Sequence, residues 1–197
     1  IFIYLDDLGY GDVGAYGATE LKTPNIDALA TGGVRFTNGY ASSATCTPSR
    51  YALLTGIYPW RNQDAKILPG TAPLIIDTGQ ITVPKMLKNK GYHTGIVGKW
   101  HLGLGTGNVN WNERVSPGPN EVGFDYGYIM AAPQDRVPTV DLEDGSVVGL
   151  EKDDPIAIDY TNNYPGQPTG HDNPSSLPMK SPPVHHSTLV HVAHPLV

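Results

Sequence analysis

The sequence predicts an α/β fold in which a mainly parallel sheet is flanked by helices. Apolar runs at residues 1–5 and 92–98 have the β-branched and aromatic composition of strands that are buried on both faces. Three intervening segments carry helix start and stop signals, so strands and helices alternate along the chain. In such folds ligands bind at the carboxyl ends of the parallel strands, and polar residues that follow a strand are therefore the first candidates for a site.

The first predicted strand, "IFIYL", runs directly into Asp6 and Asp7 and then into the glycine-rich "LGYGD". Two adjacent carboxylates repel one another when both are buried and ionised, so a positive charge has to compensate. A hard divalent cation such as Ca²⁺ takes carboxylate oxygens as ligands. The alternative is a solvated loop in which Asp7 caps a turn.

Three helices and a short strand are expected in the segments that follow. The first helix covers residues 23–32, the second runs from near Pro48 to Gly56, and the third covers 82–91. A short strand with a turn is expected over 34–40. Residues 105–197 are rich in proline and show no helical periodicity, so they are expected to form long excursions over the sheet.

Cys46, the only cysteine in the chain, stands just before the second predicted helix in "CTPSR". Unpaired N–H groups and the dipole at a helix N-terminus favour negative charge there. Arg50 lies four residues further on and can fold back beside the cysteine. The pattern indicates an anion pocket with a reactive side chain at its mouth. The alternative is a small buried apolar residue before an ordinary helix start.

Lys99 and His101 follow the next apolar run in "GKWHLG". In an extended backbone two residues at this spacing point to the same side, while Trp100 faces the opposite side and packs. Lysine offers a fixed positive charge, and histidine offers a proton donor or acceptor near neutral pH. The alternative is a strand end with a lysine that reaches solvent and a histidine that binds backbone.

Composition excludes several classes of protein. A formal net charge of -6, with no cluster of lysine and arginine, argues against a nucleic-acid partner. No apolar run reaches the roughly 20 residues that a membrane span requires, and a single cysteine rules out a disulfide scaffold. Five histidines lie after residue 170 without the spacing of a known metal site: His171, His185, His186, His191 and His194.

Taken together, these stretches resemble the formylglycine-dependent, arylsulfatase-like sulfatases, which are relatives of alkaline phosphatase. The resemblance rests on "LDDLGYGDVGAYG" at 5–17, "TPNIDALATGGVRFTNGY" at 23–40, "CTPSRYALLTG" at 46–56, "GYHTGIVGKWHLG" at 91–103 and "GPNEVGFDYGY" at 118–128. It implies the alkaline-phosphatase-like (sulfatase) fold, incomplete in this chain. Residues 1–197 are then expected to be the N-terminal portion of one catalytic domain, with the core strands, helices and site motifs in 1–104 and the excursions in 105–197.

The resemblance also implies residue roles. A formylglycine-generating enzyme would oxidise Cys46 to formylglycine, whose hydrate attacks sulfur, releases the alcohol and then expels sulfate. Asp6, Asp7 and the modified Cys46 would bind Ca²⁺, with Mg²⁺ as the alternative ion. Arg50 would hold the hydrate and the geometry of the metal site, Lys99 would bridge to sulfate oxygens, and His101 would stabilise the hydrate or assist in proton transfer. Lys99 and His101 would be the substrate-binding residues.

The implied function is hydrolysis of a small-molecule or glycan sulfate ester in a secretory, lysosomal or periplasmic compartment. The family's second histidine, which protonates the leaving group, has His194 as its candidate here. Two alternatives stay open: a phosphatase or phosphodiesterase of the same superfamily, and a non-catalytic sulfatase-like protein that binds anions. An unmodified Cys46 would favour the second alternative.

Overall fold

The computed structural model describes residues 1–133, 136, 138–153, 155–159 and 175–176. The chain divides into two compact units, one made of Ile1–Tyr4 with Ser42–Val197 and the other of Leu5–Ala41, and each is described by itself. The five histidines after residue 170 lie outside the described residues. They include His194, the candidate for the second histidine of the family.

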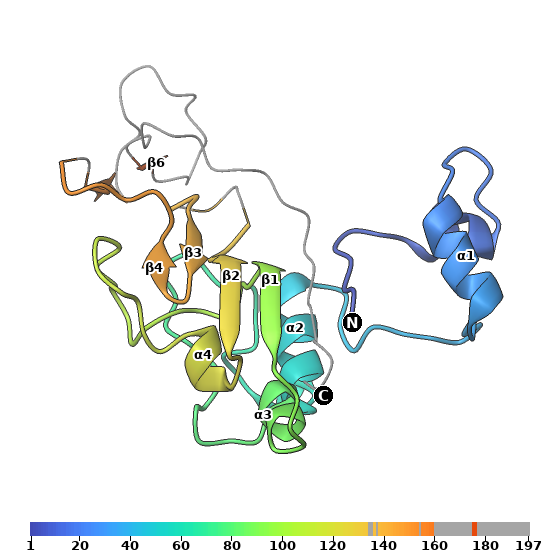
Figure 1. Cartoon of the computed structure of the whole chain (residues 1–197), viewed down its shortest axis with the longest axis horizontal. Helices are drawn as coiled ribbons and strands as arrows, with labels where there is room; N and C mark the ends of the chain where they lie inside the picture. The colour runs from blue at the N-terminus through green and yellow to red at the C-terminus, as the bar shows by residue number, and fades with distance from the viewer. Residues whose placement is uncertain (134–135, 137, 154, 160–174, 177–197) are drawn as a thin grey trace. The chain divides into compact units, whose positions relative to one another are not determined.

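The larger unit is built on a four-stranded sheet in the order β1-β2-β3-β4 (Figure 1). These strands are β1 (Gly95–Lys99), β2 (Tyr126–Met130), β3 (Asp141–Glu143) and β4 (Ser146–Val147). β1 and β2 pair in parallel, with Lys99 opposite Met130, whereas β2–β3 and β3–β4 pair antiparallel. Two short strands, β5 (Ile158–Asp159) and β6 (Ser175–Ser176), form a separate antiparallel pair. The parallel pair therefore carries the lysine of the predicted site at its carboxyl end.

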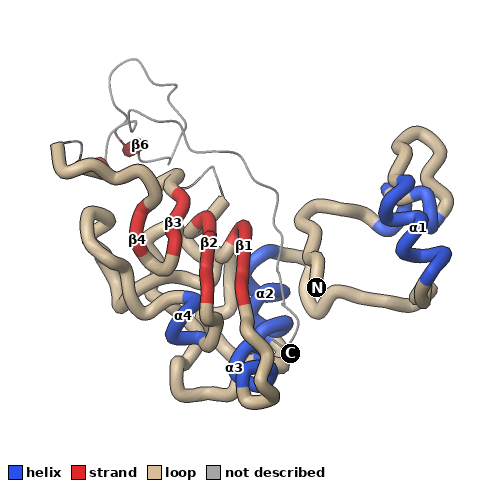
Figure 2. Tube along the Cα trace, in the orientation of Figure 1, coloured by secondary structure: helices blue, strands red, loops and turns tan. Residues whose placement is uncertain are grey.

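Helices accompany this sheet in the larger unit (Figure 2). They are α2 (Cys46–Thr55), the 3-10 helix η3 (Pro59–Arg61), α3 (Val83–Lys88) and α4 (Pro119–Val122). α2 begins two residues earlier than expected, so Cys46 is its first residue and does not precede it. α3 confirms the third predicted helix, and the side chain of Thr82 caps it by accepting a hydrogen bond from Lys85 N at 3.4 Å.

Three of the four strands of the sheet come from residues after 105, where excursions were expected. Strands of five, three and two residues and the four-residue α4 are too short to leave a clear periodic pattern. This part of the chain therefore builds the sheet beside β1.

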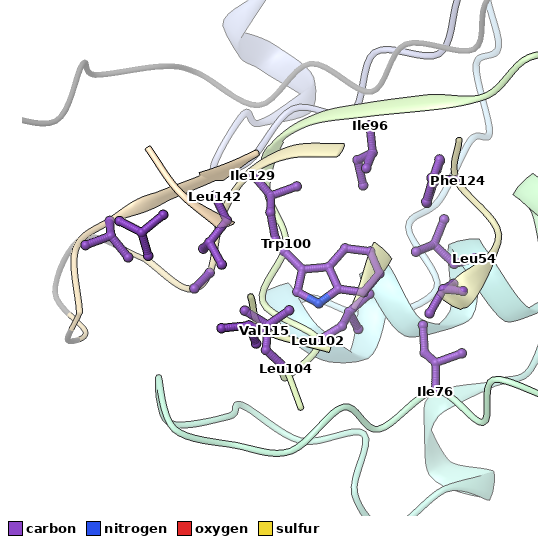
Figure 3. Close-up of a cluster of buried hydrophobic side chains, with 14 of the residues drawn as sticks. Leu54, Ile76, Ile96, Trp100, Leu102, Leu104, Val115, Phe124, Ile129 and Leu142 are labelled. Atoms are coloured by element: carbon purple, nitrogen blue, oxygen red, sulfur yellow. The ribbon is translucent and has the colours of Figure 1, made fainter. Parts of the chain in front are cut away.

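Trp100 lies at the centre of the hydrophobic core and is only 1% exposed (Figure 3). Side chains from β1, β2, β3, α2 and the loops that follow surround it, among them Leu54, Ile96, Leu102, Leu104, Val115, Ile129 and Leu142. Its indole Nε1 donates a hydrogen bond to Gly103 O at 2.7 Å. The expectation that Trp100 faces the packing side is confirmed, and this packing fixes the chain directly after β1.

The segments 72–75 and 102–105 lie against one another through backbone hydrogen bonds. Leu104 N donates to Ala72 O at 2.9 Å, Ile75 N to Leu102 O at 3.1 Å and Leu74 N to Gly105 O at 3.0 Å. Gly103 sits between these bonds with φ +77°, and a Cβ there would lie 1.8 Å from Pro73 O. Only glycine fits this backbone approach.

Two predicted strands are wrong for the described structure. Residues 1–5 form no strand beyond a single-residue bridge at Phe2, and Ile1 is 80% exposed. A strand buried on both faces needs sheet neighbours and covering layers, and the described four-stranded sheet ends at β1. Residues 34–40 also form no strand, and Val34 is 78% exposed.

The smaller unit consists of α1 (Pro24–Gly32) and two 3-10 helices, η1 (Tyr10–Asp12) and η2 (Gly14–Tyr16). α1 confirms the first predicted helix. The Asp27 carboxylate accepts a hydrogen bond from Ala15 N at 2.6 Å, and Thr23 Oγ1 accepts one from Gly14 N at 2.8 Å. These two bonds fasten η2 to the first turn of α1.

Candidate active site

Cys46 occupies the first position of the ten-residue helix α2, and its side chain is half-buried. The N-cap residue Thr45 makes no side-chain capping hydrogen bond, so the first N–H groups of α2 keep their preference for a negative group. Lys99 Nζ donates a hydrogen bond to Cys46 Sγ at 3.0 Å. The carboxyl end of β1 and the N-terminus of α2 therefore meet at the cysteine.

Arg50 supplies a second positive charge and is only 5% exposed. Its Nη1 donates to the backbone oxygen of Lys99 at 2.5 Å, and its Cζ lies 5.6 Å from the centroid of the Tyr4 ring, a cation–π distance. Arg50 therefore links α2 to the residue whose ammonium group reaches Cys46.

His101 is buried, with 1% exposure, and its backbone has the left-handed φ of 52°. Its ring Nε2 lies 2.9 Å from Leu68 O. A carbonyl only accepts, so Nε2 carries the hydrogen of the ring and Nδ1 keeps the lone pair. Nδ1 is buried and has no hydrogen-bond partner among the described residues.

Burial lowers the pKa of His101, and the positive charges of Lys99 and Arg50 lower it further against the opposing effect of the Leu68 carbonyl. The imidazole is therefore neutral at neutral pH. In this neutral ring Nδ1 carries the lone pair, so Nδ1 is the atom at which the ring can accept a proton.

The expected alternation of side chains along 99–101 does not continue to His101. β1 ends at Lys99, and the left-handed backbone of His101 turns the chain out of the extended conformation. For a non-glycine residue such a conformation costs about 1–3 kcal/mol and is kept where the surroundings over-determine it. Lys99 thus reaches Cys46, while the His101 ring reaches the carbonyl of Leu68.

Two side-chain contacts at this site, and the bond between the His101 ring and Leu68 O, have no counterpart in the predicted roles. Thr47, which is fully buried, donates from Oγ1 to His101 O at 2.8 Å. The hydroxyl groups of Tyr4 and Ser49 are hydrogen-bonded to one another. Thr47 and Ser49 belong to the motif C-T-P-S-R, but nothing in the sequence predicts these hydrogen bonds. No sequence pattern marks a backbone acceptor such as Leu68 O.

Asp6 and Asp7 belong to the unit Leu5–Ala41. Both are exposed, and Asp7 has a left-handed φ of 55°. Within the described part of the chain, no group of three or more histidine, cysteine, aspartate or glutamate side chains is arranged to hold a metal ion. The structure therefore brings Cys46, Arg50, Lys99 and His101 into one cluster and leaves the metal ligands as a prediction.

The larger unit therefore has an α/β arrangement in which positively charged groups lie close to a cysteine. A helix N-terminus, an ammonium group and a buried guanidinium all place positive potential at one side chain. This arrangement suits a nucleophile that acts on a negatively charged ester.

The chain belongs to the sulfatase family, whose profile matches residues 1–170. It is 50% identical over 191 residues to the N-acetylgalactosamine-6-O-sulfatase of Bacteroides thetaiotaomicron. This alignment covers 96% of this chain and 37% of that relative. It is 47% identical over 106 residues to human arylsulfatase A, and this alignment covers 53% of this chain and 21% of that relative. The chain thus spans little more than a third of the length of its bacterial relative.

Solved structures show the same fold. A structure from a study of the metabolism of multiple glycosaminoglycans by Bacteroides thetaiotaomicron matches with a TM-score of 0.80 and 53% identity, over 86% of this chain and 35% of that one. A second, in complex with its substrate D-glucosamine-2-N,6-O-disulfate, matches with a TM-score of 0.54 and 30% identity, over 73% of this chain and 26% of that one. These matches confirm the predicted α/β sulfatase fold.

Within the described residues, no helix has the length and apolar character of a membrane span.

Proposed function

We propose that the full-length protein hydrolyses a sulfate ester with a nucleophile derived from Cys46. The observation that carries this proposal is the hydrogen bond of 3.0 Å from Lys99 Nζ to Cys46 Sγ at the first residue of α2. Membership of the sulfatase family supports the reaction class. The sequence C-T-P-S-R from Cys46 to Arg50 supports conversion of the cysteine to formylglycine by a formylglycine-generating enzyme.

In this proposal Cys46 Sγ stands for the oxygen of the aldehyde or of its hydrate. One hydrate hydroxyl attacks the sulfur, the bond from sulfur to the alcohol oxygen breaks, and the alcohol leaves with a proton. The second hydroxyl then gives up its proton while the bond from the hydrate carbon to the sulfate oxygen breaks, and the aldehyde re-forms. Water then adds to the aldehyde and restores the hydrate, so each turnover consumes one water molecule and needs no oxidant or reductant.

The side chains of the cluster have distinct tasks in these steps. Lys99 places its ammonium group where negative charge develops on the nucleophile and on sulfate. Arg50 holds Lys99 in place by donating a hydrogen bond to the backbone oxygen of Lys99. His101 accepts a proton at Nδ1, because Nε2 is occupied by Leu68 O and the ring is neutral. Lys99 and His101 are also the proposed substrate-binding residues.

Asp6 and Asp7 are the proposed ligands of a divalent cation, with the modified Cys46 as a third ligand. Carboxylate oxygens are the donors that Ca²⁺ prefers, and Mg²⁺ also takes them. The left-handed backbone of Asp7 lies in a loop that is open to solvent. A bound cation would supply positive charge that lowers the cost of an oxyanion nucleophile.

The proposed substrate is a sulfate ester on a glycan. The relative that covers nearly all of this chain is named an N-acetylgalactosamine-6-O-sulfatase, and a structural neighbour binds a disulfated glucosamine. Both act on amino sugars by the names they carry, which favours a glycan over a simple phenol. A secretory, lysosomal or periplasmic location belongs to the same proposal and follows the family resemblance.

Turnover of matched aryl esters tests the reaction class. The full-length protein is expected to hydrolyse an aryl sulfate and a 6-O-sulfated amino sugar faster than an aryl phosphate, and Cys46→Ala is expected to abolish both sulfatase activities. Faster hydrolysis of the phosphate, or sulfate turnover that survives Cys46→Ala, would contradict the proposal.

A further inference from the structure

Two side chains on one face of α2 hold the end of β1. Thr47 and Arg50 are three positions apart on the helix, so they lie on the same face. Thr47 Oγ1 donates to His101 O at 2.8 Å, and Arg50 Nη1 donates to Lys99 O at 2.5 Å. The helix α2, which begins with Cys46, is therefore hydrogen-bonded to the backbone of both Lys99 and His101.

His101 depends on its surroundings for its conformation. Its backbone has φ 52°, its N–H donates to Ala131 O at 3.0 Å, and its ring binds Leu68 O. A left-handed backbone outside glycine persists where neighbouring groups determine it from several sides. The bond from Thr47 fixes the carbonyl of this residue from the side of α2.

We propose that Thr47 is a positioning residue, whose hydroxyl sets the backbone of His101 and thereby the place of the His101 ring and of Lys99 relative to residue 46. Thr47 touches no substrate in this proposal; it acts through His101. The inference rests on the proposed function for its kinetic consequence, but its structural part stands on the geometry of the described residues alone.

Loss of the hydroxyl would remove the donor that α2 supplies to the buried carbonyl of His101. Thr47 is 0% exposed and His101 is 1% exposed, so water does not replace the bond without a change of the backbone. A shift of reacting groups by about 1 Å can cost on the order of 100-fold in rate. The loss should appear in kcat, since positioning in the transition state is what changes.

The test compares Thr47→Val, which keeps the shape of the side chain, with Thr47→Ser, which keeps the hydroxyl. Thr82→Val is the matched control, because Thr82 is 2% exposed and donates to a backbone oxygen, that of Val122, at 2.6 Å. Thr82 also caps α3 and lies outside the cluster around Cys46. A general loss of stability from removing a buried threonine hydroxyl is therefore reproduced by the control.

Each full-length variant is measured in three ways. The modified fraction of residue 46 comes from the mass of the tryptic peptide 36–50, kcat and KM come from aryl sulfate turnover per modified molecule, and amide hydrogen exchange is followed over 99–105. Thr47→Val is expected to lower kcat by about 10- to 100-fold with little change in KM and to speed exchange over 99–105. Thr47→Ser and Thr82→Val are expected to keep kcat within about threefold of the parent.

A Thr47→Val protein with parental kcat per modified molecule would overturn the inference, as would an equal loss in Thr82→Val. A parent that carries the modified residue 46 but fails to hydrolyse sulfate esters would instead overturn the proposed function. Hydrogen exchange would then decide the inference alone, because unchanged exchange over 99–105 in Thr47→Val would contradict it and faster exchange would support it.

Discussion

Replacing Gly103 by alanine should destabilise the protein because the new Cβ has no room. The Cβ would lie 1.8 Å from Pro73 O and 3.0 Å from Ala72 O, both of them backbone atoms that cannot rotate away. The segments 72–75 and 102–105 would have to separate. Three backbone hydrogen bonds between them, at 2.9, 3.0 and 3.1 Å, would be lost or weakened.

The magnitude follows from a comparison with Gly56. Gly56 has φ +70°, close to the +77° of Gly103, but nothing lies within 4 Å of a Cβ there. Alanine at Gly56 should therefore cost only the left-handed conformation, about 1–2 kcal/mol. Alanine at Gly103 adds the loss of three hydrogen bonds at about 1 kcal/mol each, for a total of about 4–5 kcal/mol.

The assay is urea unfolding of the two variants and the parent, followed by tryptophan fluorescence and compared at equal m-value. Gly103→Ala is also expected to lower sulfatase turnover, because Leu68 O, which holds the His101 ring, precedes the displaced segment. Equal destabilisation by Gly103→Ala and Gly56→Ala would refute the reasoning, since it would show that the close approach to Pro73 carries no energy.

Three further predictions concern charge. Lys99→Met should lower kcat for an aryl sulfate by on the order of 100-fold. Lys88→Met, which removes the ion pair of 2.5 Å between the exposed Lys88 and Asp125, should leave kcat unchanged in the same assay. Burial raises the pKa of Asp125, but hydrogen bonds from Lys88 and from Thr94 outweigh it and lower the pKa to about 2 from 3.8. This carboxylate therefore stabilises the fold above about pH 4 and loses that effect as pH falls toward about 2, so the stability deficit of Asp125→Asn in urea titrations should be present at pH 7 and shrink over that interval. Dialysis against a chelator should abolish turnover and added Ca²⁺ should restore it, while Asp7→Asn should raise the Ca²⁺ concentration needed for half-maximal recovery; metal-independent turnover would contradict the proposed ligands.

Local signals were sufficient to predict the helices α1, α2 and α3 and the strand β1. Pro24 at the first turn of α1, Thr82 before α3 and Gly56 after α2 mark helix ends by their own backbone chemistry, and the structure has helices there. The apolar run before Lys99 gave β1, and the indole of Trp100 lies in the core as the alternation requires.

The site was predictable only in part, because much of it depends on backbone groups that are distant in sequence. Cys46 and Lys99 are 53 positions apart. Each was predicted as a site residue from its own place, Cys46 at the start of a helix and Lys99 at the end of a strand. The carbonyl of Leu68 leaves no mark in a sequence, and neither does the left-handed turn at His101. For residues 1–5 the sequence predicts a strand that the structure does not have. The apolar, β-branched residues show the propensity for a strand, but a buried strand also requires a neighbouring strand, which this local signal does not reveal.

The mass of the tryptic peptide 36–50 from the active full-length protein tests the central claim most directly. The account predicts the mass of an aldehyde or of its hydrate at position 46, in a fraction that rises in proportion to kcat across preparations. An unmodified thiol throughout, in a preparation that turns over sulfate esters at full rate, would contradict it.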